Sequence, residues 1–545
     1  MGHLMFYLAV VAACLLWSAA FVAAAARVER VWLRRLLAAV GWLVPPFAIL
    51  PWVGLTAWFA LLKFQTNWFG PTLTALVSVV IGGLWIRAAG MSRAADDGRP
   101  VAAGWPVLPL AAGFVLAKAV AFGTLLFIGN AVAAEGRMLR VEAAQMMAAA
   151  LPPPPAADDD AAPLYLRAVV ASAADKTLEE VKDPLAADVR SPEVAAILAR
   201  HAATLDLLRR AADKPGCRFT RDWSRPSIDM LLPEVQEMRF AARLLTLAAR
   251  KAAADGDTAA ALADVVRIRR VGMHAATEPI LICGLVGQAI DTMALQVLAD
   301  VLPRLGKKDL PLLDGMALRD FVATPVSYQR HFLGEEAFGL ATAADLADDR
   351  QGRSLAFLSA LEGSPRTSFP LDRPLSFLYR CFMLPADEAG YRSIMRRYQN
   401  IFASLPSTRP FPEIKKQIDE IEEGIKERRD GIFTSLIAPA LSNVLKTQFR
   451  GWALHEAAEV LVAATRARLA DGAVPDSIAA LVPDRLSAPP RDPFTADAPL
   501  LSKQVDDAWV VYSVGPDGED DGGPPPPGAA EIAAGNDDVG LRLAP

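Results

Sequence analysis

The sequence predicts a mainly α-helical membrane protein: a four-helix transmembrane region, then a helical water-soluble body and a small α+β module. Long apolar runs are confined to the first 134 residues, which also hold eight of the eleven tryptophans. Apolar residues then recur at helical spacing through most of the remaining chain. Alternating strand patterns occur only near the C-terminus. The high mean hydropathy, +0.26, therefore comes from one end of the chain.

Four apolar runs are long enough to cross a hydrocarbon core, which takes about 20 residues of helix. The first run contains Cys14, and a cleaved signal peptide or a lipoprotein signal is the alternative to a retained helix. The absence of Lys or Arg before this run favours the retained helix. The predicted transmembrane domain, residues 1–134, therefore contains the spans Leu4–Ala25, Leu36–Leu62, Trp68–Ile86 and Pro106–Ile128.

Basic residues in the short loops predict the orientation, because Lys and Arg flanking a span favour the cytoplasmic side. The loops after the first and third spans carry Arg27, Arg30, Arg34, Arg35, Arg87, Arg93 and Arg99. The opposite side carries only Lys63, Arg137 and Arg140. We therefore expect a bacterial inner-membrane protein whose large C-terminal region is extracytoplasmic.

Charge and cysteine content exclude some partners. Residues 1–134 carry nine basic and three acidic residues, or +6, which leaves −11 for the rest of a chain whose net charge is −5. An acidic body without Lys or Arg clusters argues against nucleic-acid binding. Cys217, Cys283 and Cys381 have no CxxC spacing, so we expect buried free thiols, with one disulfide among them as the alternative.

A predicted helix extension and Pro/Asp linker, residues 135–162, precedes an α-helical extracytoplasmic domain at residues 163–441. Ser191, Pro192 and Glu193 form an N-terminal helix signal, and we expect that helix to reach Ala212. Asp255-Gly256-Asp257 separates two longer helices. These form a hairpin similar to one tetratricopeptide unit, and a third helix packs on it; the three ranges are Leu232–Ala254, Thr258–Thr277 and Ile280–Leu302.

The rest of the helical body has weaker patterns. Between Gly306 and Arg373 we expect short helices with mobile connections. Leu375–Leu384 is short and contains Arg380, which favours a buried helix over a fifth membrane contact. Glu413–Arg429 is dense in charge and predicts a solvated helix.

The last predicted domain, residues 442–545, is a long helix, Ser442–Ala470, followed by a small module. Ala508–Val514 and Val539–Leu543 have the composition of two short strands that pair across a long acidic loop. Calcium takes six to eight oxygen ligands, which carboxylates in a Gly-rich loop can supply. On this local chemistry Asp520 and Asp521 are candidate ligands, and a solvated acidic loop is the alternative.

The order Asp492-Pro493-Phe494, then Tyr512 to Gly518, then Asp537-Asp538 resembles the C-terminal globular part of the major pseudopilins of type II secretion. The likeness covers residues 455 to 543 and implies a short sheet with a calcium-binding end. By resemblance, Asp517, Asp537 and Asp538 become candidate calcium ligands. The N-terminal helix and peptidase motif of pseudopilins are absent, so pilus assembly is not implied.

No catalytic motif is found, which favours a protein that is not an enzyme. The helix residues His455 to Glu459 lack the second histidine of a zinc peptidase. A cluster between Cys217 and Arg225 predicts a loop held in place by its aromatic residues, with a polar pocket as the alternative. We therefore expect an interaction or scaffold protein whose partners are the lipid bilayer and other envelope proteins. A membrane-anchored hydrolase acting on an envelope substrate is the alternative.

Overall fold

The structure, a computed structural model, divides into two compact units. Unit 1 comprises Met1–Val141, Thr342–Ser393 and Glu423–Ala438; unit 2 comprises Glu142–Ala341, Ile394–Glu422 and Pro439–Pro545. The structure describes scattered residues between 12 and 40, then residues 107–172, 183–226, 232–314, 327–349, 354–361, 372–405, 411–427, 430–438, 442–505, 507–524 and 536–544, together with 230 and 351.

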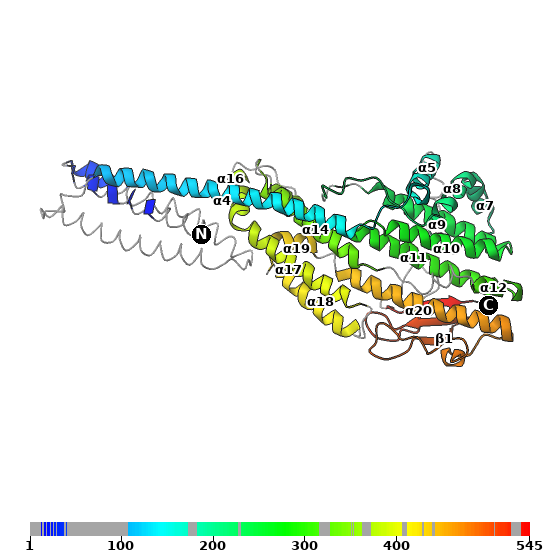
Figure 1. The fold of residues 1–545 in the computed structure, drawn as a ribbon. Helices are drawn as coiled ribbons and strands as arrows, with labels where there is room; N and C mark the ends of the chain where they lie inside the picture. The colour runs from blue at the N-terminus through cyan, green and yellow to red at the C-terminus, as the bar shows by residue number, and fades with distance from the viewer. Residues whose placement is uncertain are drawn as a thin grey trace. The chain divides into compact units, whose positions relative to one another are not determined.

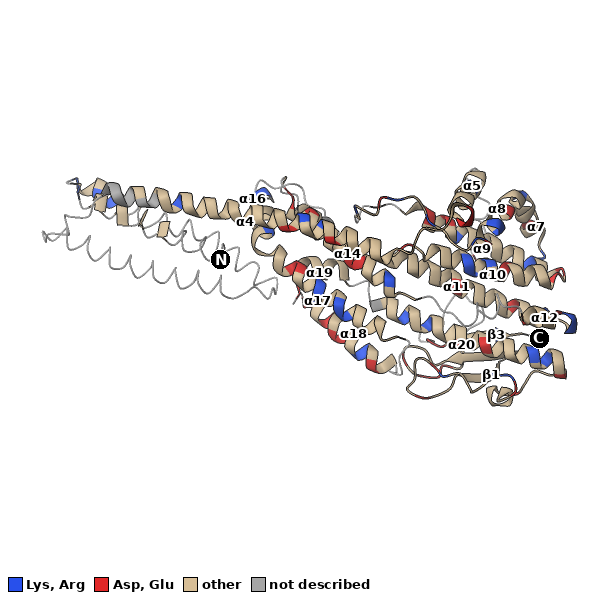
Figure 2. Ribbon diagram, in the orientation of Figure 1, with Lys and Arg blue, Asp and Glu red and all other residues tan. Residues whose placement is uncertain are grey.

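Helix α4, Val107–Ala150, confirms that the predicted fourth span continues as one helix into its polar extension. Before Glu135 its only charged residue is Lys118, as the nearly uncharged ribbon in Figure 2 shows. Only 28% of its most apolar stretch is buried, and Phe122 and Phe127 are exposed. Such an uncovered apolar surface is typical of lipid contact rather than of a soluble core.

Within the described residues, two helices are long and apolar enough to cross a membrane, at Val115–Ala150 and Leu281–Arg304. The second is 67% buried over its apolar stretch, as expected of a core helix. Two of the four predicted spans, Leu36–Leu62 and Trp68–Ile86, lie almost wholly outside the described residues, and Leu4–Ala25 is described only in part. Two candidates are thus found where the sequence predicts four spans.

Unit 1 is helical (Figure 1) and packs around two glycines of α4. A Cβ at Gly129 would meet the Phe377 ring at 2.9 Å, and one at Gly136 would meet the Ala347 Cβ at 2.7 Å. The ion pair between Arg140 and Asp345, at 2.7 Å, lies at the same contact. Besides α4, the helices that contribute to this unit are α14 (Gln329–Ala347), α15 (Ser354–Leu361), α16 (Asp372–Phe382), α17 (Leu384–Ala403), α18 (Phe411–Lys426) and α19 (Ile432–Ile437).

Two helices of these regions correct the sequence prediction. Gln329–Ala347 is a single helix of 19 residues, longer than the short helices expected between Gly306 and Arg373. Helix α18 does carry a charged face, but its isoleucines at positions 414, 418, 421 and 425 are buried. That spacing is an apolar stripe, so α18 is amphipathic rather than solvated on all sides. Helix α16 confirms the helix predicted over Leu375–Leu384, and its Arg380 is buried.

Unit 2 contains the predicted helical hairpin. Helices α9, Pro233–Ala254, and α10, Thr258–Ala275, pack on each other, and α11, Leu281–Val301, packs on both. Gly256 has a φ of 87°, and the Asp257 carboxylate accepts a hydrogen bond from the Ala260 N–H at 3.0 Å. A left-handed glycine followed by a capping aspartate therefore makes the turn, as predicted.

Smaller helices lie beside the hairpin (Figure 1). The predicted N-terminal cap of helix α7 is confirmed, because the Ser191 Oγ accepts a hydrogen bond from the Val194 N–H at 3.3 Å. The helix does not run unbroken to Ala212, because it is interrupted at His201. The remaining short helices of this unit are α5 (Ala162–Ser172), α7 (Pro192–Arg200), α8 (Ala202–Ala212) and α12 (Leu310–Leu313), with 3₁₀ turns at Ala157–Asp159, Leu302–Arg304, Lys307–Asp309 and Ile478–Leu481.

The C-terminal module of unit 2 is an antiparallel sheet in the order β1-β2-β3, packed on helix α20, Ser442–Asp471. The expected pairing of β2, Ala508–Ser513, with β3, Val539–Leu543, is confirmed. Strand β1, Leu501–Val505, was not predicted. It is an edge strand whose side chains are only partly buried, so its sequence carries little apolar alternation.

Candidate functional site

The acidic loop between β2 and β3 contains the predicted calcium ligands. The Asp538 side chain is buried; its Oδ2 accepts from the Gly523 N–H at 2.6 Å, whereas its Oδ1 has no hydrogen-bond partner among the residues that the structure describes. Burial, followed by the nearby charges of Asp520 and Asp521, raises the pKa of Asp538 despite hydrogen bonds from Gly523 and Asp521. Three of the candidate carboxylates thus lie in one neighbourhood.

The other two candidates are held differently. The Asp517 Oδ1 accepts from the Glu519 N–H at 3.1 Å, a local turn. Asp537 forms an ion pair with Arg450 at 3.1 Å. Asp520 is also engaged, because it accepts from the Tyr512 hydroxyl at 2.9 Å. Within the described ranges, no three His, Cys, Asp or Glu side chains are arranged as ligands of one metal ion.

The loop's shape depends on glycine. Gly515 has a φ of 69°, and a Cβ there would lie 1.9 Å from the Asp537 carbonyl oxygen. Gly523 has a φ of 88° and donates to Asp538. The left-handed backbone and the close approach both require glycine at these turns.

Asp492 joins the loop before β1 to the end of β2. Its Oδ1 accepts from the Ser513 hydroxyl at 2.6 Å and from the Phe494 N–H at 2.9 Å, and its Oδ2 accepts from the Val514 N–H at 3.0 Å. Asp492 is buried, so these donors replace water around its charge. The Asp-Pro-Phe and Tyr-Ser segments noted in the sequence therefore meet through this carboxylate.

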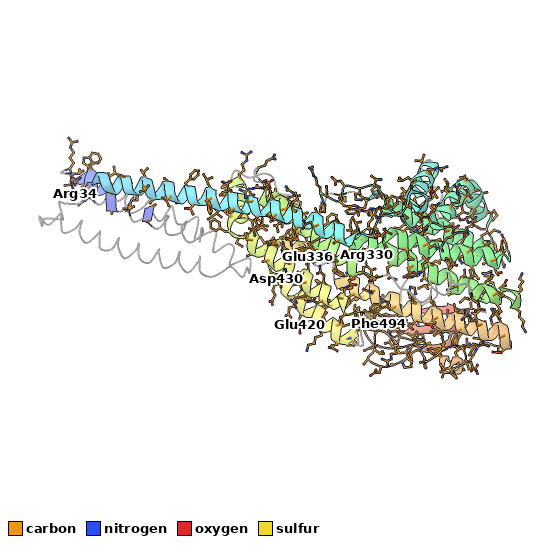
Figure 3. The ribbon with its side chains drawn as sticks, in the orientation of Figure 1. Arg34, Arg330, Glu336, Glu420, Asp430 and Phe494 are labelled. Carbon is orange, nitrogen blue, oxygen red and sulfur yellow. The ribbon has the colours of Figure 1, made fainter. Side chains whose placement is uncertain are left out.

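Phe494, labelled in Figure 3, fixes the same loop to the helices. Its ring lies 4.8 Å from that of Phe411 and 5.7 Å from that of Phe449 on α20. All three rings are buried. The hydrogen bonds of Asp492 and this aromatic cluster together fix the module against α18 and α20.

A second polar cluster lies at one end of the hairpin. Arg221 donates from Nη2 to Glu234 at 2.8 Å and lies 3.5 Å from Glu278. Burial raises the pKa of Glu278 to about 7; Arg221 opposes the shift and Glu234 adds to it. Glu278 is therefore a buried carboxyl that changes charge near neutral pH.

The loop between Cys217 and Arg225 is packed against the body by its aromatic residue, as predicted. Cys217 and Trp223 are buried, and the Arg221 guanidinium lies 5.5 Å from the centre of the Trp223 ring. Asp222 and Arg225 point to solvent. Trp223 therefore holds the loop in place, while Arg218 and Arg221 are partly buried and donate hydrogen bonds to Pro152 and Glu234.

The cysteine prediction is confirmed, because Cys217, Cys283 and Cys381 are all free and buried. Burial raises the pKa of the Cys283 thiol to about 12, and it also raises that of Cys217. A thiol must lose its proton to act as a nucleophile. Cys217 and Cys283 therefore keep their protons near neutral pH.

A buried histidine and aspartate meet where α11 packs on α20. His455 Nε2 lies 2.7 Å from the Asp291 Oδ2, while Arg269 donates from Nε to the Asp291 Oδ1 at 2.9 Å. The exposed fractions of the His455 and Asp291 side chains are 4% and 1%. Because solvent does not reach this pair, it links α10, α11 and α20 rather than forming an open catalytic dyad.

Two further histidines of the body are also packed. His274 lies 2.9 Å from the Tyr165 hydroxyl, and His331 lies 3.0 Å from the Ala276 carbonyl oxygen. Burial lowers the pKa of each histidine to about 4. Both are therefore neutral at neutral pH. No protein-family model matches the chain, and neither a curated protein nor a solved structure shows significant similarity to it.

Proposed function

We propose that the chain is a membrane-anchored protein whose helical body and C-terminal module lie outside the cytoplasm and bind other envelope proteins. The observation that carries this proposal is α4, whose exposed apolar surface leads without a break into a segment bearing Glu135, Arg137 and Arg140. A helix that changes from apolar to charged within one continuous length is suited to leave a bilayer and enter water. The finer proposal is a bacterial inner membrane crossed by four helices, as the arginine asymmetry indicates.

A labelling experiment tests the topology. The three native thiols of the body are buried, so a cysteine introduced at exposed Asp484 reports on the C-terminal module. We expect D484C to react with an impermeant maleimide in intact spheroplasts, whereas R93C in the predicted cytoplasmic loop reacts only after lysis. The reverse pattern would place the body in the cytoplasm and refute the proposal.

Cross-linking then tests the interaction role. In membranes, the full chain is expected to cross-link reproducibly to other envelope proteins through its body. Adducts only with itself or with lipid would contradict an interaction function. The hydrolase alternative has weaker support, because the His455–Asp291 pair is enclosed by helices.

We further propose that calcium stabilises the C-terminal module, with Asp538 at the centre and Asp520 and Asp521 beside it. The buried, unpartnered Asp538 Oδ1 and its like-charged neighbours support this choice. Asp517 and Asp537 are the further candidates, and Asp537 would have to leave Arg450 to contribute. The Lys503 ammonium lies 5.4 Å from the centre of the ring of Tyr512, the residue that donates to Asp520. A cationic side chain is therefore already close to the acidic loop.

Millimolar calcium is expected to raise the melting temperature of the purified full chain, because a ligand that binds only the folded state stabilises it. D538N should abolish the shift, whereas D484N, on an exposed residue elsewhere in the module, should leave it intact. Equal shifts in both variants, or none in the native chain, would reject the site.

A further inference from the structure

A small pocket in unit 2 lies apart from the predicted calcium ligands and takes one wall, Phe219, from the loop between Cys217 and Arg225. It has a volume of about 180 Å³ and is bounded by side chains of α5, α8 and α9 and by Phe219. In Figure 1, these three helices lie close to one another. Sites for drug-sized molecules usually measure about 300 to 1,000 Å³, so this pocket suits a single chemical group.

The walls of the pocket are apolar and aromatic. Leu208 and Met238 are buried there, while Leu166 is 51% exposed. Tyr165, Phe219 and Phe240 present three aromatic rings. Aromatic faces attract cations by about 0.5 to 2 kcal/mol each, and apolar walls favour an alkyl stem.

The charges of the lining are all negative. Glu234 and Glu237 contribute carboxylates, and none of the lining side chains that the structure describes is Lys or Arg. Arg221 neutralises Glu234 at 2.8 Å. Glu237, in contrast, has neither an ion pair nor a hydrogen bond to its side chain in the part of the chain that the structure describes. Among the described residues, the pocket therefore holds one carboxylate that lacks a counter-ion.

We infer that this pocket binds an alkylammonium group, with the cation at Glu237 and the apolar stem between the aromatic side chains. The same chemistry is offered by a free amine and by a lysine side chain of a partner segment. A carboxylate on a ligand would be repelled, and a neutral alkyl group would leave Glu237 without a partner. This inference does not depend on the proposed topology, because the pocket is complete within unit 2.

The test uses the full chain in nanodiscs and ligand-observed NMR, with empty nanodiscs as the blank. n-Hexylammonium should bind about tenfold more tightly than 1-hexanol, a typical difference for a hydrogen bond to a charged group. E237Q should remove that difference. E193Q deletes an exposed carboxylate from the first turn of α7 and should preserve it.

A second pair of probes distinguishes the sources of the ammonium. If the pocket accepts the lysine side chain of a partner, a blocked Gly-Lys-Gly peptide should bind more tightly than the same peptide with norleucine in place of lysine. If only free amines fit, hexylammonium will bind and the lysine peptide will not. Either result supports the inference, provided that E237Q retains the native melting temperature. Equal binding of hexylammonium and hexanol, or equal effects of E237Q and E193Q, would overturn it.

Discussion

Glu278 illustrates how burial controls the charge of one residue. Its folded-state pKa is about 7 against an ordinary 4.5, so the folded chain holds this proton more tightly than the unfolded chain does between those values. Its stabilising contribution is therefore complete below pH 4.5 and is lost as the pH rises through about 7. Arg221 reduces the shift but does not cancel it.

E278Q removes this titration. We expect the melting temperature of E278Q, relative to that of the native chain, to rise between about pH 5 and about pH 8, because only the native chain acquires the buried charge. Thermal unfolding followed by circular dichroism measures the difference. E413Q, on an exposed residue, should show no such trend. A difference that is independent of pH would contradict the assignment.

Asp492 supplies a prediction for the C-terminal module. D492A leaves the Ser513 hydroxyl and the Phe494 and Val514 amides without their acceptor, at a cost of about 3 kcal/mol. The D492A variant should have a lower melting temperature, and hydrogen exchange at the Phe494 and Val514 amides should be faster. D497A, in the exposed part of the same loop, should change stability by less than about 0.5 kcal/mol. Similar exchange rates in both variants would exclude the role given to Asp492.

At the scale of elements, α4 offers a comparison of the same substitution at two glycines. A Cβ at Gly136 would lie 2.7 Å from the Ala347 Cβ and 3.2 Å from the Ala344 carbonyl oxygen. A Cβ at Gly123 would meet nothing within 4 Å. Close approach of α4 and α14 within unit 1 therefore depends on Gly136 and not on Gly123.

G123A is expected to stabilise the folded chain by up to about 1 kcal/mol, because alanine favours a helix more than glycine does. G136A should instead destabilise it by about 1 to 3 kcal/mol, because packed backbone has to move. Melting temperatures in the same detergent measure both effects. Changes of the same sign would show that the two helices do not pack as described.

At the scale of the whole molecule, the chain passes between the two units five times, so no single cut separates them. A fragment that starts at Glu142 retains the Thr342–Ser393 part of unit 1 but lacks the buried α4 residues Val132, Ala133 and Leu139. We expect this fragment to melt at a lower temperature than one that starts at Gly129. Equal melting temperatures in the same detergent would mean that α4 adds nothing to the stability of unit 1.

Local sequence signals account for much of the fold. Asp255-Gly256-Asp257 predicts the hairpin turn because a left-handed glycine and a capping aspartate act within a few residues. The interruption at His201 and the edge strand β1 were not predicted, since neither contains a strong turn signal or apolar alternation. Of the site residues, the acidic loop was recognised from composition, whereas Glu237 was not, because nothing near it in sequence distinguishes it from a surface glutamate.

The sequence by itself determined where apolar helices, turns and the acidic loop occur, because periodicity, capping and residue type act over a few positions. Only the tertiary structure decided which distant groups meet, such as Asp291 with His455, 164 positions apart, and Asp492 with Ser513. It also decided that Glu278 is enclosed and that Glu237 faces a pocket. Desolvation and charge pairing depend on what surrounds a side chain in space, and helical periodicity does not encode that.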